Sequence, residues 1–260
     1  MPIITLTSDW RNNDYYLAAV KGRLLTTCPG SVVVDISHQI SPFNLSQAAF
    51  VLKNCYLNFP DDTIHLIAVK DEASEKAPHV LVHSGKHHFI TADNGIFGLL
   101  LDEEPEEVVS LHENYPSTTS FACLEVFCPV ACDLSKGRKY SEIGSKYEKL
   151  NKQVPMLPAI DESVINGSVV YIDSYQNAVT NITRELFEQI GKNRRFDIFI
   201  QSNHYRVDRI NTYYGQTTVG ELLAVFNTAG ALEVGINNGN AADLLNLSVG
   251  SVVRVKFYDK

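Results

Sequence analysis

Acidic and amide side chains follow several apolar, strand-like segments of this chain. Asp9 and Asp14 come after residues 3–7, and Asp71 comes after residues 63–69. Other polar residues hold similar positions: Asp35, Ser37, His38 and the run Asp93-Asn94-Gly95. One acid alone is as readily a helix cap or a turn former. Because ligands of parallel α/β sheets bind beyond the carboxyl ends of the strands, the group as a whole predicts a polar ligand site there.

Two segments of the second half carry another polar set. Residues 172–177 end a strand-like run with Asp173, Tyr175 and Asn177, and residues 232–242 run from a strand into an Asn/Gly turn. Turn formation alone would explain both segments, since Asn and Gly make tight turns between strands. The functional alternative is a flat heterocycle that stacks on the Tyr ring and bonds to the Asn amide, which offers both a donor and an acceptor.

The first half of the chain alternates strand-like and helix-like segments. Apolar, β-branched runs predict strands, and longer segments with one apolar face predict helices between them. The expected elements are strands at 3–7, 32–37 and 63–69, helices at 14–27, from 44 to about 57 and at 127–134, and a hairpin at 79–91. The βαβαβ order predicts an α/β N-terminal domain, residues 1–155, with a central, mainly parallel sheet.

The second half changes character after a polar, proline-containing stretch at 138–163, which we interpret as a linker. Short β-like runs then dominate, and one helical segment interrupts them. The expected strands are 168–172, 196–200, 231–236 and 251–257, and the expected helix is 184–190. This pattern predicts a smaller, β-rich, barrel-like C-terminal domain, residues 163–260.

Net charge, the length of the apolar runs and the cysteine spacing argue against several classes of protein. The formal net charge is −8, which argues against a protein that tracks nucleic-acid phosphates. Apolar runs are too short to cross a bilayer and the start lacks a signal-peptide pattern, so we expect a cytoplasmic protein with no membrane partner. The five cysteines form no CxxC pair, and the adjacent His87 and His88 would point to opposite faces of a strand. We therefore expect no metal site.

Six sequence fragments, in order along nearly the whole chain, resemble one family. It is the S-adenosylmethionine (SAM)-cleaving family of the SAM hydroxide adenosyltransferases, the fluorinase and the chlorinase. The fragments resemble its TDFG-type start, its DITH…PF…AAF stretch, its PDNG, its D-R-F-G-N…TNI segment and its GE…NS…N.GNAA ending. They are residues 6–9 with Asp14 and 21–22; 35–38 with 42–43 and 48–50; 93–95; 173–182; 220–222 with 227–228; and 237–242.

The resemblance implies an α/β domain followed by a barrel-like domain, assembled as a homotrimer. SAM would bind between the N-terminal domain of one subunit and the C-terminal domain of the next. The reaction would be an in-line attack on ribose C5′ that expels neutral methionine, with water giving adenosine and halide giving a halodeoxyadenosine. SAM would be substrate or ligand, and no further cofactor is implied.

The resemblance also implies roles for residues that bind the sugar and the methionine. The carboxylate of Asp9 would hold the ribose diol, and Phe43 would lie against the sugar. Asp14 and Asp173 would pair with the methionine ammonium, and Thr228 would bond to the methionine end.

Adenine would be recognised by residues of the second half. Asn177 would bond to the edge of the base, and Tyr175 and Tyr213 would be stacking faces. The backbone near Ala241 would close the pocket.

The water-activating Asp-Arg-His set of the family's hydrolases is where this chain departs from the pattern. Their VVDPGVGT.RR segment reads AVKDEASEKAP here, which puts Lys70 at the Asp position and Ala77 and Pro78 at the Arg positions. Ala122 replaces the His. A shift of one residue would make Asp71 the acid, so Asp71 is the candidate catalytic residue. The halogenases' threonine/tyrosine pattern and the fluorinase's extra loop are absent from the sequence.

Three hypotheses therefore stay open. The first is a SAM hydrolase with a rebuilt water site, for which Asp71, Glu72, Lys70 and Glu125 are the candidates. The second is a homologue that binds SAM or adenosine without turnover. The third is a trimeric protein whose pocket serves another ligand.

Overall fold

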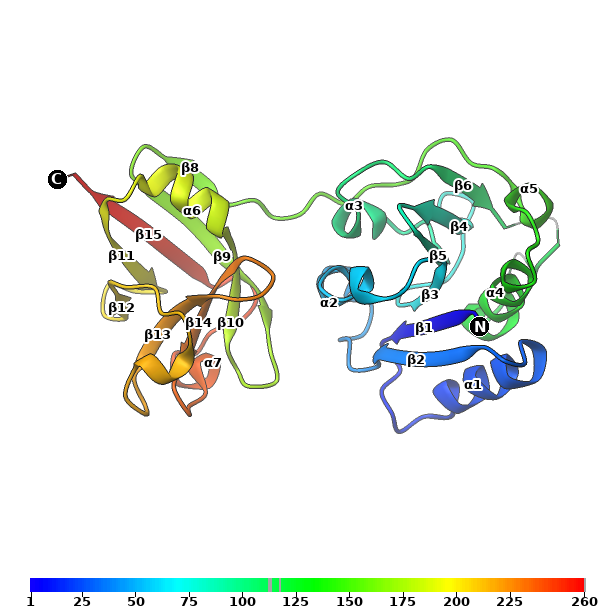
Figure 1. The fold of residues 1–260 in the computed structure, drawn as a ribbon, viewed down its shortest axis with the longest axis horizontal. Coiled ribbons are helices and arrows are strands. Elements are labelled where there is room, and N and C mark those ends of the chain that lie inside the picture. Colours follow the sequence, from blue (N-terminus) through cyan, green and yellow to red (C-terminus); the bar gives the residue numbers. More distant parts are fainter. Residues whose placement is uncertain (112–113, 117, 260) are drawn as a thin grey trace. The chain divides into compact units, whose positions relative to one another are not determined.

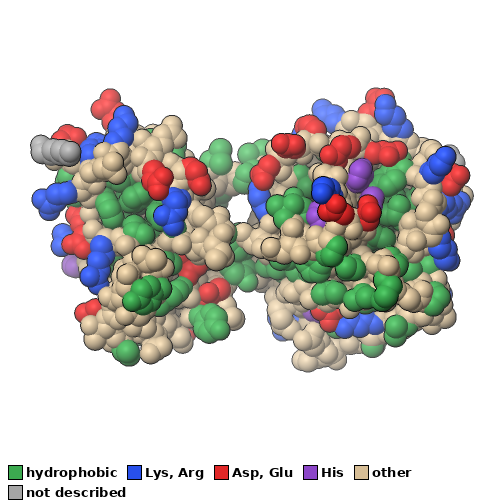
Figure 2. Space-filling model, in the orientation of Figure 1, with side chains coloured by type: hydrophobic (Ala, Val, Ile, Leu, Met, Phe, Trp, Pro, Cys, Tyr) green, Lys and Arg blue, Asp and Glu red, His purple; other side chains and the backbone are tan. Residues whose placement is uncertain are grey.

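The computed structural model describes residues 1–111, 114–116 and 118–259. These residues form two compact units, Met1–Pro155 and Met156–Lys260 (Figure 1). Figure 2 shows Asp and Glu side chains interspersed with Lys and Arg on the visible face of each unit. No helix among the described residues combines the length and the apolar character that a bilayer crossing requires.

The first unit is an α/β domain built on one sheet. Within its described residues the sheet has seven strands in the order β2-β1-β3-β5-β4-β6-β7. The pairs β1–β2, β1–β3 and β3–β5 are parallel, and the pairs that involve β4, β6 and β7 are antiparallel. The strands are β1 (Ile3–Ser8), β2 (Val32–Ser37), β3 (Thr63–Ala68), β4 (His79–Ser84), β5 (His87–Ala92), β6 (Glu107–Ser110) and β7 (Ser145–Lys146).

Helices cover both faces of this sheet. All six residues of β3 are buried, as in a parallel strand that is covered on both sides. Leu66 packs in one core with Leu24 of α1, and the next residue, Ile67, packs in another core with Leu52 of α2, because successive side chains of a strand point to opposite faces. The helices are α1 (Tyr15–Thr27), α2 (Leu45–Lys53), 3₁₀ helix η1 (Tyr56–Asn58), α3 (Phe97–Leu100), π helix η2 (Cys123–Phe127), α4 (Cys128–Ser135) and α5 (Tyr140–Ile143).

The second unit is a β-rich domain with an almost closed sheet. Among residues 156–259 the strand order is β12-β11-β15-β9-β10-β14-β13, with β8 paired to β9, and all these pairs are antiparallel. A bridge between Asn211 and Val225 joins the segment after β12 to β13. The strands are β8 (Ala159–Asp161), β9 (Val164–Ile172), β10 (Ala178–Thr183), β11 (Arg195–Ile200), β12 (Arg206–Val207), β13 (Leu222–Phe226), β14 (Ala231–Ile236) and β15 (Val252–Tyr258).

Short helices complete the second unit: α6 (Arg184–Gly191), 3₁₀ helix η3 (Tyr214–Gln216) and α7 (Ala241–Leu244). Phe187 of α6 makes edge-on contacts with the rings of Phe196, Phe226 and Phe257, at centroid distances of 4.9, 5.4 and 5.2 Å. These contacts tie the helix to the core of the barrel-like sheet. The predicted fold class, an α/β domain followed by a smaller barrel-like domain, is confirmed.

The prediction of a linker over 138–163 is wrong for much of that stretch, which contains α5, β7 and β8. The two residues of β7 pair with Val109 and Ser110 of β6. Gly144 lies so close to the Ser110 carbonyl that a Cβ there would clash with it. The predicted helix from 44 to about 57 is also too long: α2 ends at Lys53, and η1 follows as a separate turn.

Candidate functional site

An open pocket of about 840 Å³ lies at the carboxyl ends of β1 and β3 in the first unit. It brings together Asp9, Asp14, Phe43 and Asp71, which come from three separate parts of the sequence. The rest of its lining comes from the same loops and from the segment before η2: Trp10, Arg11, Tyr16, Pro42, Lys70, Glu72, Thr119, Ser120, Phe121 and Ala122.

Asp9 fixes the entrance loop of this pocket. Its Oδ2 accepts a hydrogen bond of 2.8 Å from the backbone N–H of Phe43. Phe43 has a left-handed φ of 64° and a side chain that is 71% exposed. Such a backbone conformation is unfavourable for an aromatic residue, so the Asp9 carboxylate stabilises it. The carboxylate keeps acceptor capacity for a ligand hydroxyl, because two oxygens offer about four lone-pair positions.

Asp14 is the N-cap residue of α1, but its side chain makes no capping hydrogen bond. An N-cap carboxylate usually accepts a bond from the backbone of the first helical turn. Here the exposed carboxylate lines the pocket instead. It is therefore available to a cationic group of a ligand.

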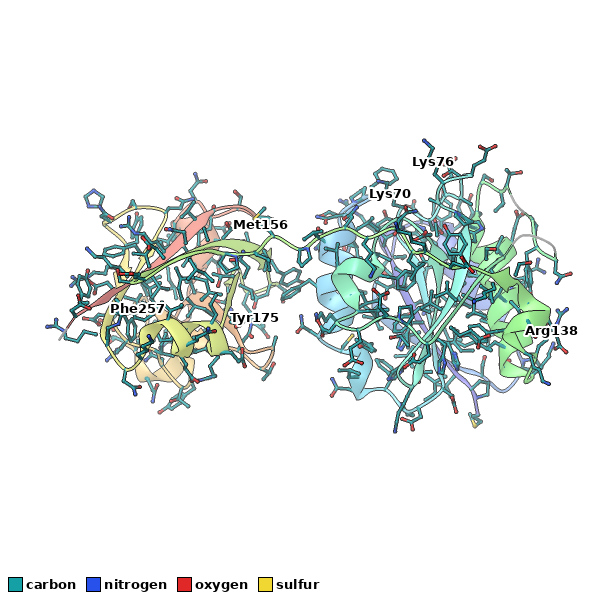
Figure 3. All side chains as sticks on the ribbon, turned by 90° about the horizontal axis from the view of Figure 1, so that it is seen from above. Lys70, Lys76, Arg138, Met156, Tyr175 and Phe257 are labelled. Atoms are coloured by element: carbon teal, nitrogen blue, oxygen red, sulfur yellow. The ribbon has the colours of Figure 1, made fainter. Side chains whose placement is uncertain are left out.

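Two side chains at the ends of neighbouring strands hold the loop that carries Asp71: Asn94, which follows β5, and His79, the first residue of β4. Asn94 Nδ2 donates to the backbone carbonyls of Val69 and Lys70, at 3.2 and 2.9 Å. His79 Nε2 donates to the Asp71 carbonyl at 2.9 Å. Lys70 and Lys76, labelled in Figure 3, belong to this loop, and Lys70 has a left-handed φ of 50°. The bonds hold Asp71 in a defined position without engaging its carboxylate.

Burial raises the pKa of Asp71 to about 6, and the negative charges of Asp9 and Glu72 act in the same direction. Burial lowers the pKa of His79, so this ring is neutral at pH 7 and its Nε2 carries the proton that it donates. A carboxylate with a pKa near 6 is largely ionised at neutral pH and binds a proton better than an ordinary one. Asp71 therefore has the properties of a general base.

The positions to which the resemblance assigns the Asp-Arg-His set fall partly in this pocket. Lys70 and Ala122 line it, whereas Ala77 and Pro78 are not part of its lining. Ala122 is 5% exposed and offers no side chain that could accept a proton. Ala122 therefore supplies no base, and Lys70 and the carboxylates of Asp71 and Glu72 are the candidate proton acceptors that line the pocket.

Other predicted polar residues act within the scaffold. Burial alone would raise the pKa of Asp35, but hydrogen bonds and charges from His38 and Lys21 outweigh it and lower that pKa. His38 is buried, 2.7 Å from Ser8 Oγ and 3.1 Å from Asp35 Oδ1. Asp93 is fully buried and accepts hydrogen bonds from Asn151 and Tyr147.

A second open pocket, of about 550 Å³, lies in the second unit. It is lined by Asp173, Ser174, Tyr175, Asn177, Tyr214 and residues 236–240. Asp173 Oδ1 accepts the backbone N–H groups of Tyr175 and Asn177, at 2.9 and 2.8 Å, and its Oδ2 accepts Asn177 Nδ2 at 3.1 Å. Tyr175, labelled in Figure 3, is left with its side chain 76% exposed. The turn therefore presents an aromatic ring and an amide from a fixed backbone.

Tyr214 is a pocket residue that the sequence analysis missed. Its hydroxyl donates to buried Glu233, which also accepts from Asn227 Nδ2 at 2.9 Å. A Cβ on Gly235 would lie 2.8 Å from Asn177 Oδ1 and 2.9 Å from Tyr214 Cε1. Glycine at this position lets both side chains approach β14. The sequence indicates only that two adjacent tyrosines, Tyr213 and Tyr214, precede a turn. It does not indicate which of the two rings lines the pocket.

Three predicted ligand residues lie outside the lining of this second pocket. Tyr213 is 61% exposed, and Ala241 is fully buried at the start of α7. Thr228 lies in the turn between β13 and β14. Among the described residues, no group of three or more His, Cys, Asp or Glu side chains is arranged to hold a metal ion.

Comparison with known proteins gives matches over both units. The model of the SAM hydroxide adenosyltransferase N-terminal domain matches residues 4–144, and that of the C-terminal domain of the same family matches residues 167–254. The (R)-S-adenosyl-L-methionine hydrolase of Thermus thermophilus is 29% identical over 95% of this chain and 97% of its own length. A fluorinase of Actinoplanes sp. is 23% identical over 98% and 97%.

Solved structures share the fold. An uncharacterized conserved protein from Thermotoga maritima aligns with a TM-score of 0.86 at 24% identity, covering 98% of this chain and 99% of that one. A conserved hypothetical protein from Thermus thermophilus aligns with a TM-score of 0.76 at 26% identity, covering 99% and 100%.

Proposed function

Because this chain belongs to the SAM hydroxide adenosyltransferase family, we propose that it hydrolyses S-adenosylmethionine to adenosine and methionine. The observation that carries the proposal is the position and pKa of Asp71. This carboxylate, with a pKa raised to about 6, lies in one pocket with Asp9, Asp14 and Phe43. The (R)-SAM hydrolases that are similar over nearly the full chain support the same substrate.

In the proposed complex, the first pocket binds the ribose, and residues of both units bind the methionine. Asp9 accepts hydrogen bonds from the ribose diol, and Phe43 lies against the sugar. Asp14 pairs with the methionine ammonium, which its uncapped carboxylate supports. Asp173 adds to that pairing, since its three hydrogen bonds leave acceptor capacity on its two oxygens. Thr228 bonds to the methionine end of SAM.

The second pocket binds adenine in this proposal. Tyr175 stacks on the base, and the amide of Asn177 bonds to its edge. Tyr213 is a further stacking face, and the backbone at Ala241 closes the site. Each pocket holds only part of the proposed ligand contacts, so we propose a homotrimer in which the first pocket of one subunit and the second pocket of the next enclose one SAM. Light scattering of the purified protein tests the subunit number.

Hydrolysis needs a water molecule in line with the bond between C5′ and sulfur. The water oxygen forms a bond to C5′ while the C5′–S bond breaks, and the electron pair leaves with sulfur as neutral methionine. The proton of the water passes to Asp71. The leaving group is already activated as a sulfonium, so positioning and exclusion of bulk water contribute most of the rate.

The alternative is a protein that binds SAM or adenosine without turnover. The observation that favours it is Ala122, a buried methyl group at the position of the family's histidine. Incubation of the purified protein with SAM, with and without added chloride, separates the two functions by chromatography. The proposal predicts catalytic release of adenosine and methionine. SAM that stays intact but bound, detected by calorimetry, would contradict hydrolysis and establish the alternative.

A further inference from the structure

Three aromatic rings line the first pocket and contact one another. The ring centroids of Trp10 and Phe121 lie 5.3 Å apart and those of Tyr16 and Phe121 lie 5.1 Å apart, both in edge-to-face geometry. Trp10 and Tyr16 complete the group at 6.0 Å. We call these three residues the aromatic cluster. Each also belongs to the pocket lining, so the cluster is accessible to a ligand.

The cluster is anchored on its inner side. Trp10 and Phe121 pack against the core of the first unit, and both are only partly buried. Fixed rings of this kind present a defined surface at little cost in conformational entropy. The Phe43 ring, by contrast, is largely exposed.

The cluster lines the same pocket as Asp9 and Asp14, the two carboxylates that hold the ribose and the ammonium in the proposed complex. Trp10 directly follows Asp9, and Tyr16 comes two residues after Asp14. With the ribose on Asp9 and the ammonium on Asp14, the atom between them is the sulfonium sulfur. Because the three rings line the same pocket as both carboxylates, this part of SAM is the one that the cluster is available to contact.

The charges of the pocket favour a cation at this place. Asp9, Asp14, Asp71 and Glu72 line it, whereas Arg11 and Lys70 are its basic residues. A desolvated cation is attracted to the face of an aromatic ring, most strongly to tryptophan. A ring also contributes this attraction without the hydration that a further carboxylate would carry.

We propose that Trp10, Tyr16 and Phe121 recognise the sulfonium charge of SAM and so discriminate it from neutral thioethers such as S-adenosylhomocysteine. This inference rests on the proposed function. The sulfonium charge disappears as the C5′–S bond breaks, so the cluster stabilises bound SAM more than the transition state. Weakening it is therefore expected to raise KM without lowering kcat.

Trp10 is the only tryptophan of the chain, which allows a test without changing the shape of the pocket. Growth on fluorinated tryptophans replaces this one ring by isosteric rings whose faces are progressively poorer in electrons. Calorimetry then gives the Kd of SAM and of S-adenosylhomocysteine for each protein. We expect the affinity for SAM to fall by about tenfold across the series, a size typical of a cation–π contact. The affinity for S-adenosylhomocysteine should change less than about twofold.

Equal losses for both ligands, or no loss for either, would overturn the inference and leave the proposed function standing. An unlabelled protein that binds neither SAM nor adenosine would overturn both. Phe121→Leu gives a second measurement, since it removes a ring but keeps an apolar side chain. It should raise KM for SAM by several-fold at an unchanged or higher kcat, and a fall in kcat alone would contradict the role.

Discussion

The two pockets use carboxylates in opposite ways. In the second unit, both oxygens of Asp173 accept hydrogen bonds from the adjacent turn, which fixes Tyr175 and Asn177. In the first unit, Asp71 is held by its backbone while its carboxylate faces the pocket with a raised pKa. In the proposed function, this difference separates a surface that binds adenine from a carboxylate that accepts a proton.

Asp71→Asn should have the largest effect, because it removes the carboxylate that we propose as the proton acceptor. Removing a positioned general base typically costs ~10²–10⁴ in rate, so kcat for adenosine release should fall by at least about 100-fold. The Kd for SAM should stay within about threefold, because the amide keeps the shape of the side chain. Glu72→Gln is the matched control, since it lies next to Asp71 in the same pocket. A similar loss in both variants would argue against a specific role for Asp71.

Asp9→Ala should weaken ligand binding in the first pocket. Hydrogen bonds to a charged group contribute ~1.5–3 kcal/mol, which corresponds to a loss of about 10–100-fold in adenosine affinity. Calorimetry with adenosine measures it, and Asp102→Ala, a change of an exposed carboxylate paired with Lys53, is the control. Unchanged affinity for adenosine would contradict the proposal that Asp9 binds the ribose.

Asn177→Ala should have a smaller effect, because it removes a neutral hydrogen-bonding group. A net value of ~1 kcal/mol for such a bond corresponds to a loss of several-fold to tenfold in adenosine affinity. Asn203→Ala, on an exposed amide that accepts from Arg254, serves as the control in the same titration. Equal affinity for the Asn177 variant and the wild type would place adenine elsewhere.

The burial of the Asp71 carboxylate should also appear in the pH dependence of the free energy of unfolding. The folded pKa of Asp71 lies above its unfolded value, so ionisation destabilises the native state as pH rises from about 4 through about 6. Asp71→Asn should therefore raise the free energy of unfolding at pH 8, by up to ~3 kcal/mol, and much less at pH 4.5. Urea denaturation at both pH values measures it. An Asp71→Asn variant that is less stable than the wild type at pH 8 would contradict the claim that the buried, ionised carboxylate destabilises the fold.

Much of the fold could be predicted from local sequence patterns. The strands at 32–37 and 231–236 have the predicted bounds, because each is a short, mainly apolar run that follows closely on a glycine turn. The two-residue strand β7 could not be predicted, since its only support is its pairing with β6, far away in the sequence. Local propensity does not report such pairing.

The candidate site was predictable only in part. The grouping of Asp9, Asp14 and Asp71 follows from strand order, because carboxyl ends of parallel strands meet at one edge of the sheet. The raised pKa of Asp71 depends on burial by residues distant in sequence, so no local pattern indicates it. The inward direction of Tyr214 depends in the same way on Glu233 and on the missing Cβ of Gly235.

The most direct test of the proposed reaction is the fate of oxygen from the solvent. SAM is incubated with the protein in water enriched in oxygen-18, and the adenosine is analysed by mass spectrometry. The proposed attack of water on C5′ predicts one heavy oxygen in the 5′-hydroxyl of every adenosine released, at a rate that rises with pH through about 6. Adenosine without the label, or SAM that remains uncleaved, would contradict hydrolysis at C5′.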